Sequence, residues 1–290
     1  MDAFSRHLMT RKFKKVVHEY SLKDTILYSL GVGVGFDPRD SSQLKFVYED
    51  GLRPMPSMAV VLAHPGFWAK EPDTGIDWVK LLHVGQEFEL HESLPEAGKV
   101  YSVTRVVDVL DKGADKGAII ISERVVKDFE TNSKICTVRT TSFARGNGGF
   151  SEGGKVGSKI KSVIPDRECD IESELDTFPN SALIYRLSGD LNPLHASPEV
   201  AKSAGFDGPI LHGLCTFGVS CHAILRSALD YDDKAVKKMG ASFTSPVYPG
   251  DTVVTKIWEV SYGYSFQCFS KDSGAKIIDN GFVVVREGEI

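Results

Sequence analysis

The residues best suited to chemistry lie between Tyr185 and Gly218, in the stretch YRLSGDLNPLHASPEVAKSAGFDGPILHGLCTFG. Asp190, Asn192 and His195 occur within six residues of one another, and Gly189 and Pro193 interrupt any regular helix or strand there. A turn of this kind brings a carboxylate, an amide and an imidazole together, and such groups can move protons. We predict an active-site loop here, although an Asp followed by a His also occurs in ordinary surface caps.

Two helices must position this loop. The Ser-Pro-Glu sequence at 197–199 is typical of a helix start, and that helix is expected to end near Gly205. The residues 210–229 are apolar on nearly every face, which predicts a second helix that is buried. Gly213 lies in its first turn, where the backbone N–H has no partner within the helix. This N–H suits an oxyanion, but the glycine could equally serve close packing of the helix.

His212 and Cys215 stand one turn apart at the start of the same helix. They suggest a second base or half of a metal site, but a Cys/His pair without further ligands is more common in a core. We therefore predict no metal. The five cysteines are odd in number and show no paired CxxC spacing, which indicates reduced thiols.

The rest of the chain reads as two halves, each with helical segments followed by strands. We expect an opening helix within the basic first twenty residues and a short strand over Lys45–Tyr48. Further strands are predicted at 100–110, 117–127, 134–143, 239–247, 252–260, 264–270 and 276–286. The glycine-rich segment 143–159 reads as a linker, so the domains are placed at 1–150 and 151–290. The GVGVG run at 31–35 follows a predicted helix, unlike a dinucleotide fingerprint, which follows a strand.

Several motifs together resemble one family. They are YRLSGD-x-NPLH at 185–195, AGFD-x-PILHG at 204–213, LCTFG at 214–218, YSLGVG at 28–33, KFVYE at 45–49 and PVYPG at 246–250. The sequence is similar to the (R)-specific enoyl-CoA hydratases, the hydratase 2 group of the MaoC-like hot-dog proteins, which includes the hydratase units of peroxisomal multifunctional enzymes. The similarity covers most of the chain.

This resemblance implies an α+β fold of the double hot-dog type, in which antiparallel sheets wrap a long buried helix and the N-terminal half is degenerate. The degenerate half would leave an apolar cavity for an acyl chain, and enlarging Ala59 or Ala63 would then shorten the preferred substrate. The implied catalytic residues are Asp190, Asn192 and His195, with Gly213 as the oxyanion donor. The implied reaction is hydration of trans-2-enoyl-CoA to (3R)-3-hydroxyacyl-CoA in fatty-acid β-oxidation, without a cofactor other than the substrate's own coenzyme A.

The resemblance also suggests supporting residues and a context. Tyr28 and Glu49 match family positions, and the cations Arg145 and Lys155 beside the linker are candidates for coenzyme A phosphates, although a solvated linker is an equal alternative. A homodimer is expected. The family indicates a peroxisomal location, whereas the chain ends in Glu-Gly-Glu-Ile, which is not an SKL-type address.

Composition excludes other classes of protein. The net charge of −5 argues against general nucleic-acid binding, and no apolar run has the length and character of a membrane helix. The first residues lack the apolar core of a secretory signal. Two alternatives to the hydratase remain, a noncatalytic acyl-CoA-binding hot dog and an acyl-CoA thioesterase. Retention of Asp190, Asn192, His195 and Gly213 together favours the hydratase.

Overall fold

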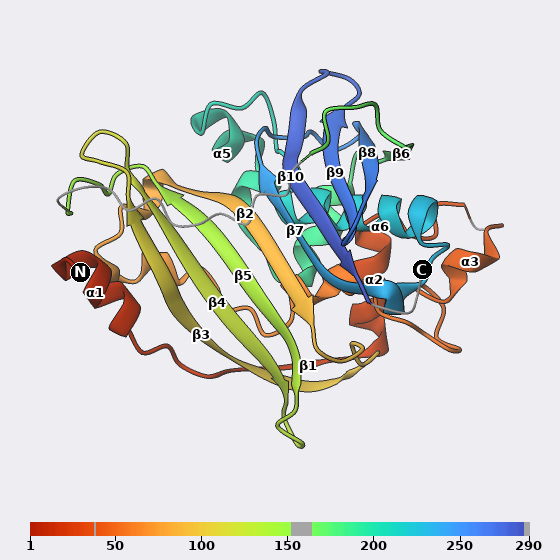
Figure 1. Ribbon diagram of the computed structural model, residues 1–290, viewed down its shortest axis with the longest axis horizontal. Helices are drawn as coiled ribbons and strands as arrows, with labels where there is room; N and C mark the ends of the chain where they lie inside the picture. Colours follow the sequence, from red (N-terminus) through yellow and green to blue (C-terminus); the bar gives the residue numbers. More distant parts are fainter. Residues whose placement is uncertain (38, 152–163, 287–290) are drawn as a thin grey trace.

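The computed structural model describes residues 1–37, 39–151 and 164–286. Within these ranges the dominant feature is one ten-stranded antiparallel sheet with the order β1-β3-β4-β5-β2-β7-β10-β9-β8-β6 (Figure 1). The first five positions in this order belong to the first half of the chain and the last five to the second half. The expected antiparallel sheets are therefore confirmed, and they join into a single surface.

The first half contributes the strands β1 (Val16–Tyr20), β2 (Leu81–Leu90), β3 (Gly98–Asp111), β4 (Ala118–Asp128) and β5 (Lys134–Ala144). The second half contributes β6 (Ile171–Asp176), β7 (Val236–Phe243), β8 (Thr252–Val260), β9 (Gly263–Ser270) and β10 (Lys276–Val285). The predicted meander is the β3-β4-β5 set, and the four strands predicted after residue 238 also form. β-branched and aromatic residues, which pack well on a pleated surface, dominate these runs.

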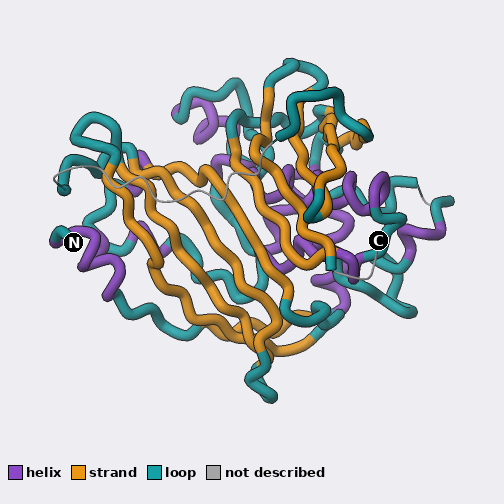
Figure 2. Tube along the Cα trace, in the orientation of Figure 1, coloured by secondary structure: helices purple, strands orange, loops and turns teal. Residues whose placement is uncertain are grey.

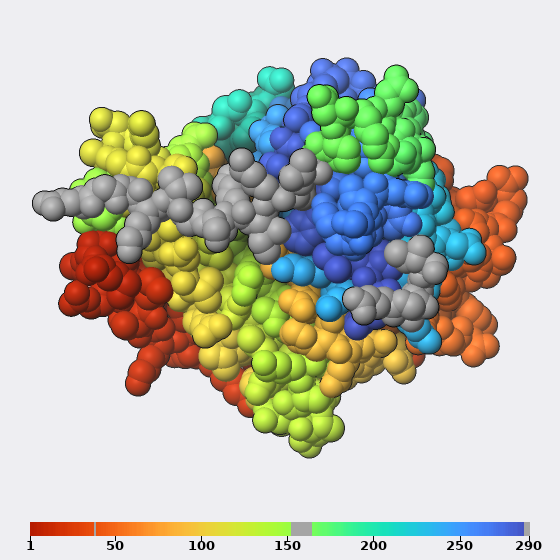
Figure 3. All heavy atoms as spheres, in the orientation of Figure 1, coloured from red at the N-terminus to blue at the C-terminus, as the bar shows by residue number. Residues whose placement is uncertain are grey.

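The two halves join through the ladder between β2 and β7. Gly85 pairs with Ser242 at one end of this ladder, and Glu89 pairs with Lys238 at the other. The Lys238 ammonium also lies 2.9 Å from the Glu87 carboxylate, which adds a charge pair to the backbone hydrogen bonds. Figure 3 shows atoms of the first half (yellow to green) and of the second half (blue) in direct contact on this face.

The helices are few and mostly short: α1 (Ala3–Thr10), α2 (Leu22–Gly31), α3 (Ser41–Leu44), α4 (Ser181–Tyr185), α5 (Pro198–Ser203) and α6 (Gly213–Ala228). Short 3₁₀ turns occupy Pro56–Val60, Trp68–Lys70, Pro72–Thr74, Trp78–Lys80, Arg186–Ser188, Pro193–His195 and Asp233–Ala235. The tube view shows most helices gathered beside the second set of strands (Figure 2). No helix in the described ranges is long and apolar enough to cross a membrane.

The predicted buried helix is α6, in which the eleven residues from Cys215 to Leu225 are all buried. It packs against α2 at Gly218, where a Cβ atom would overlap Val32 Cγ1 and would lie 3.1 Å from the Tyr28 hydroxyl. A glycine is therefore needed at this crossing. The corresponding position in the first half holds only the ten-residue α2 and the 3₁₀ turn Pro56–Val60, as the degenerate-half prediction requires.

The expected opening helix forms as α1 but ends at Thr10. Residues 16–20 form a strand, because Val16, His18 and Tyr20 alternate inward along a β-branched and aromatic run. Lys45–Tyr48 is not a strand. Its backbone continues the turn after α3, with Phe46 N–H bonded to the Gln43 carbonyl and Tyr48 N–H to the Leu44 carbonyl.

The strands β2 and β6 were not predicted at all. β2 contains Gly85 and a histidine, and β6 alternates three acids with apolar or small residues, so neither run carries a strong strand signal. The predicted linker lies partly in residues 152–163, which fall outside the described residues.

Candidate active site

The predicted loop is a sharp connection between two short helical segments. α4 runs into the 3₁₀ turn Arg186–Ser188, and Gly189 then adopts a φ of 116°, which non-glycine residues rarely adopt. This glycine turns the chain so that Asp190 follows at the surface. Asn192 caps the next 3₁₀ turn, Pro193–His195, by accepting a hydrogen bond at Oδ1 from the Leu194 N–H at 3.1 Å.

Asp190 and Asn192 are tied together by the same turn. The Asp190 Oδ1 atom accepts a hydrogen bond from the Asn192 N–H at 3.1 Å, and both side chains are exposed. One oxygen of the carboxylate and the Nδ2 group of Asn192 form no hydrogen bond within the described residues. The loop therefore presents an acceptor and a donor outward, as a site for water and substrate requires.

His195 is the buried member of the trio, with 8% of its surface exposed. Its Nδ1 lies 2.8 Å from the Ile210 carbonyl oxygen. Because a carbonyl can only accept, Nδ1 carries the hydrogen and Nε2 is left with a lone pair. Burial lowers the pKa of His195, while the Ile210 carbonyl and the Asp190 charge act in the opposite direction. The neutral ring with a free Nε2 lone pair is the form that accepts a proton.

His212 is buried, as predicted for a core residue, and it also contacts the predicted loop. Its ring stacks on His195 with a centroid separation of 3.8 Å, and its Nε2–H donates to the Asp190 carbonyl oxygen at 3.1 Å. Burial, followed by the nearby His195, lowers the pKa of His212 to about 4. The sequence feature that could have indicated this contact is that His212 immediately precedes Gly213, as the N-cap residue of α6.

Asp190, His195 and His212 each offer a ligand atom, and these atoms lie within 4.8 Å of one another. Cys215, the partner considered from the sequence, does not join them, because its Sγ donates to the Gly31 carbonyl at 3.3 Å. Asp190 contacts the His212 ring through its backbone carbonyl, and His195 uses Nδ1 for Ile210. These bonds orient the two rings for proton chemistry, and the absence of a metal stays a prediction.

Gly213 is the first residue of α6, and its N–H forms no hydrogen bond within the described residues. A Cβ atom on Gly213 would lie 3.6 Å from the Phe243 ring, which is ordinary contact. Packing alone thus does not require glycine here, in contrast to Gly218. An unpaired N–H at the positive end of a 16-residue helix can hold a developing oxyanion.

A cavity of about 280 Å³ begins beside the loop at Leu187–Gly189. This volume is near the lower end of the roughly 300–1,000 Å³ typical of small-molecule sites. Its apolar wall includes Leu27, Met58, Val61 and Ala63, so the segment expected to line an acyl cavity does so. Ala63 is among the lining residues, whereas Ala59 is buried and is not, so the effect of enlarging either residue on chain length stays a prediction, with Ala63 the better placed of the two.

The other predicted residues divide into two groups. Tyr28 lines the cavity, is fully buried and lies 5.9 Å from the Tyr185 ring, so the structure places it with the site. Glu49 is exposed in the turn after α3 and makes no described contact with the loop. Arg145 is exposed just after β5, also without such a contact, and Lys155 lies outside the described residues.

The sheet junction supplies two further side chains that the sequence did not reveal. Phe243 of β7 lies next to Gly213, and His83 of β2 packs edge-on against the Phe243 ring at 5.0 Å. The Asp190 charge reaches His83 as well, where it partly offsets the lowering of the His83 pKa by burial. The strands that join the halves therefore form one wall of the site, beside the oxyanion position.

Comparison with known proteins agrees with this geometry. The chain matches the MaoC like domain over residues 161–280 and the MFE-2 hydratase 2 N-terminal domain over residues 18–146. It is 39% identical to the enoyl-CoA hydratase ChsH3 of Mycobacterium tuberculosis, covering 84% of this chain and 85% of that protein. It is 36% identical to peroxisomal multifunctional enzyme type 2 of Mus musculus, over 91% of this chain but 36% of that longer protein.

Solved structures give the same result. A MaoC-like dehydratase from Phytophthora capsici superposes with a TM-score of 0.85 at 31% identity, covering 97% of this chain and 98% of that one. A conserved hypothetical protein of Mycobacterium tuberculosis, described as a double hotdog fold, shares only the fold, with a TM-score of 0.53 at 12% identity over 95% of this chain and 94% of that one. Fold and site thus define a double hot-dog protein. Specifically, the chain belongs to the MaoC-like hydratase 2 family.

Proposed function

We propose that this chain is an enoyl-CoA hydratase 2, an enzyme that adds water to trans-2-enoyl-CoA and forms (3R)-3-hydroxyacyl-CoA in fatty-acid β-oxidation. The proposal rests on the arrangement of a carboxylate, two imidazoles and a backbone N–H beside a cavity. The Asp190 carboxylate lies close to the His195 and His212 rings, the Gly213 N–H next to His212 is unpaired in the described residues, and the loop 187–189 that precedes Asp190 lines a cavity suited to an acyl chain.

The reaction uses these groups as follows. A water held between Asp190 and His195 Nε2 adds its oxygen to C3 of the alkene and gives a proton to one of the two side chains. The alkene electrons move toward the thioester, whose oxygen gains negative charge and is stabilised by the Gly213 N–H. C2 then takes a proton from the same pair, so that H and OH are added overall and the enzyme is unchanged.

The remaining side chains hold this arrangement in place. His212 fixes the Asp190 backbone through its Nε2–H, and the stacked rings keep His195 in one orientation. Asn192 shapes the turn through Oδ1 and keeps Nδ2 available for the water. The acyl chain enters the cavity along Met58 and Val61, where each buried methylene contributes about 0.8 kcal/mol.

The proposed compartment rests on the names of two relatives. One relative is named a peroxisomal enzyme in Mus musculus and another in Arabidopsis thaliana, which supports a peroxisomal location for this chain. A homodimer and coenzyme A contacts from Arg145 and Lys155 complete the proposal. Light scattering after size exclusion would measure the oligomeric state. Weakened binding of a saturated acyl-CoA by Arg145→Ala would support the coenzyme A contact.

One assay separates the hydratase from its alternatives. Purified protein with trans-2-decenoyl-CoA should lose enoyl absorbance while releasing no free thiol, and chiral analysis of the product should give the (3R) alcohol. Release of thiol would indicate a thioesterase instead. Binding without either change would indicate an acyl-CoA-binding protein, and a (3S) product would contradict the proposed stereochemistry.

A further inference from the structure

One edge of the cavity belongs to a segment that forms neither an α-helix nor a strand. His64 and Gly66 line the cavity, as does the loop 187–189. We call residues 64–66 the cavity rim. From the rim the chain continues to the start of β2 through three short 3₁₀ turns. The position of the rim therefore depends on what holds the chain on either side of it.

The sheet holds the rim on its N-terminal side. Ala63, the residue before the rim, donates its N–H to His18 Nδ1 of β1 at 3.1 Å. The Ala63 carbonyl accepts a hydrogen bond from Ser102 Oγ of β3 at 2.6 Å. Because β1 and β3 are paired with each other, both bonds fix Ala63 to the same part of the sheet.

On its C-terminal side the rim is followed by a segment without a strand ladder. Among the described residues, the backbone-to-backbone hydrogen bonds of residues 67–74 stay within the segment. Asn147 reaches the segment from outside, but it binds the backbone of Gly75 and Asp77, which lie farther from the rim. The part next to the rim must therefore be held by side chains from another element.

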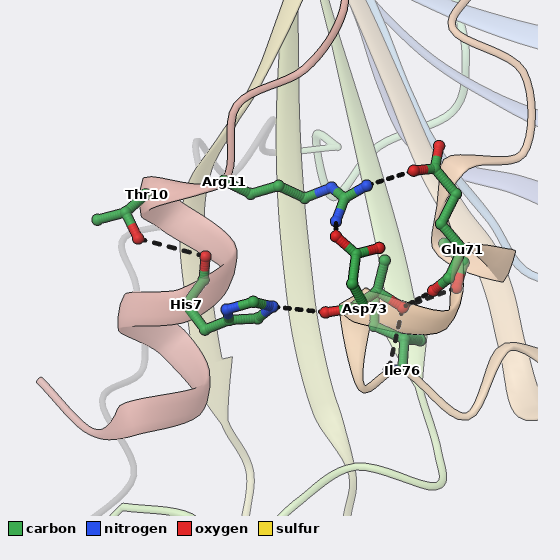
Figure 4. A network of polar contacts seen from close by, with 8 residues as sticks. His7, Thr10, Arg11, Glu71, Asp73 and Ile76 are labelled. Carbon is green, nitrogen blue, oxygen red and sulfur yellow. Dashed lines mark hydrogen bonds and ion pairs between the residues drawn. The ribbon is translucent and has the colours of Figure 1, made fainter.

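Arg11, at the C-terminal end of α1, supplies this contact. Its guanidinium pairs with the carboxylates of both Glu71 and Asp73, and its side chain is only 9% exposed (Figure 4). One turn earlier in α1, His7 donates its Nε2–H to the Asp73 carbonyl oxygen at 2.6 Å. Because the Arg11 side chain is largely covered and binds two carboxylates, these pairs contribute more than an isolated pair between two exposed side chains.

Aromatic contacts extend this anchor toward the rim. The Arg11 guanidinium lies 5.4 Å from the centre of the Phe13 ring, and that ring packs edge-on against Trp68 at 5.1 Å. Only Phe67 separates Trp68 from the rim residue Gly66. The rim is thus suspended between two anchors, one on the sheet and one built by residues 7–13.

We propose that Arg11 is a positioning residue for the cavity rim and thereby strengthens the binding of long acyl chains. Arg11 belongs neither to the cavity lining nor to the catalytic loop, and it acts through the segment that follows the rim. Without it, the rim would be held only at Ala63 and would move away from the acyl chain, while α6 and the loop 187–189 would stay in place. This inference rests on the proposed hydratase activity and adds a residue outside its motifs.

The test compares trans-2-decenoyl-CoA with crotonyl-CoA, whose shorter chain has fewer methylenes to bury. Arg11→Ala should raise KM for the decenoyl substrate about tenfold, as expected when one or two methylenes are no longer buried. The value of kcat on both substrates, and KM for crotonyl-CoA, should stay within about twofold of the wild type. Arg105→Ala is the matched control, because Arg105 also pairs with a carboxylate, that of Glu123, but on β3 and β4. It should leave both KM values unchanged.

The carboxylate side of the ion pair gives a second, milder test, which decides the matter if Arg11→Ala does not fold. Asp73→Asn changes a side chain that is 65% exposed, and it should also raise KM for the decenoyl substrate. Combined with Arg11→Ala it should add nothing further, because both changes remove the same pair. Arg11→Lys keeps the charge but loses the forked geometry, so it should restore part of the lost binding.

Other outcomes would overturn the inference and leave the hydratase standing. An unchanged KM for the decenoyl substrate in Arg11→Ala would do so, and equal losses of kcat/KM on both substrates would assign Arg11 a general structural role. Additive effects of Arg11→Ala and Asp73→Asn would contradict a shared anchor. Turnover of neither substrate by the wild type would refute the hydratase itself. Calorimetric binding of saturated decanoyl-CoA then tests the rim alone, and equal affinity of the wild type and Arg11→Ala would refute its positioning by Arg11.

Discussion

The two halves of the sheet differ in the helices that pack against their strands, and the two halves therefore have different roles in the site. The second half packs the 16-residue α6, whose first turn supplies Gly213 and whose N-cap is His212. The first half packs the short α1 against β3, and its α2 and the 3₁₀ turn Pro56–Val60 contribute residues to the wall of the cavity. A complete helix thus positions the reacting groups, while an incomplete one makes room for the substrate.

The largest effect should come from the loop of the second half. Asp190→Asn or His195→Ala removes an acid or base and should lower kcat by at least about a hundredfold. The fold should remain, since Asp190 is exposed and the His195 side chain makes one hydrogen bond. Single-turnover kinetics with circular dichroism as the control would measure this, and a fully active Asp190→Asn protein would end the mechanism.

The helix terminus gives a sharper test. Proline is favoured at the first position of a helix and has no N–H, so Gly213→Pro should keep α6 but remove the oxyanion donor. We expect kcat to fall about a hundredfold. Gly213→Ala is the matched control, because it keeps the N–H and places its methyl in ordinary contact with Phe243. Equal activity of the proline and alanine variants would remove Gly213 from the mechanism.

The first half should control chain length without touching the chemistry. Val61 lines the cavity, and Val61→Phe should reduce kcat/KM about tenfold for trans-2-decenoyl-CoA but little for crotonyl-CoA, because several methylenes lose their buried position. The exposed Val103 of β3 offers a control, Val103→Phe, that adds the same bulk outside the cavity. Equal losses on both chain lengths would show that Val61 is general core.

The smallest effect concerns pH. Burial lowers the pKa of His195, so this ring stays neutral at pH values where an exposed imidazole would already be protonated. If catalysis needs the neutral ring, kcat should change less than about twofold between pH 7.5 and 6.5 and should fall only under more acidic conditions. A pH–rate profile with its acid midpoint at or above 6.5 would contradict a neutral His195 as the base.

The sequence was informative where several local signals agreed. The loop 185–195 combined turn residues with groups that move protons, and α6 combined length with apolar character on every side. The loop and the buried helix could therefore be predicted. The stacking of His212 on His195 depends on how the loop folds back on α6, and the approach of Phe243 and His83 depends on how the two halves join, so neither could be predicted. Arg145, Glu49 and Lys155 were chosen by residue type or motif, and a residue type does not determine a position in space.

The strands that were missed in the sequence depend on tertiary contacts. β2 pairs with β5 and β7, strands that are distant in sequence, and this pairing overrides the weak strand preference of a run containing Gly85. β1 was read as helix because its basic flank hid a five-residue alternating pattern. The polar part of the cavity wall could not be predicted either, because His18 and His64 come from separate segments.

The open ends of the sheet have a consequence for how the protein behaves at high concentration. A ten-stranded sheet that does not close has two outer strands, β1 and β6, whose free backbone groups could recruit other chains and start aggregation. Both are short, with five and six residues, and β6 carries Glu172, Glu174 and Asp176 at alternate positions. Like charges would face each other if two β6 strands met edge to edge, so this edge is protected against aggregation by strand pairing.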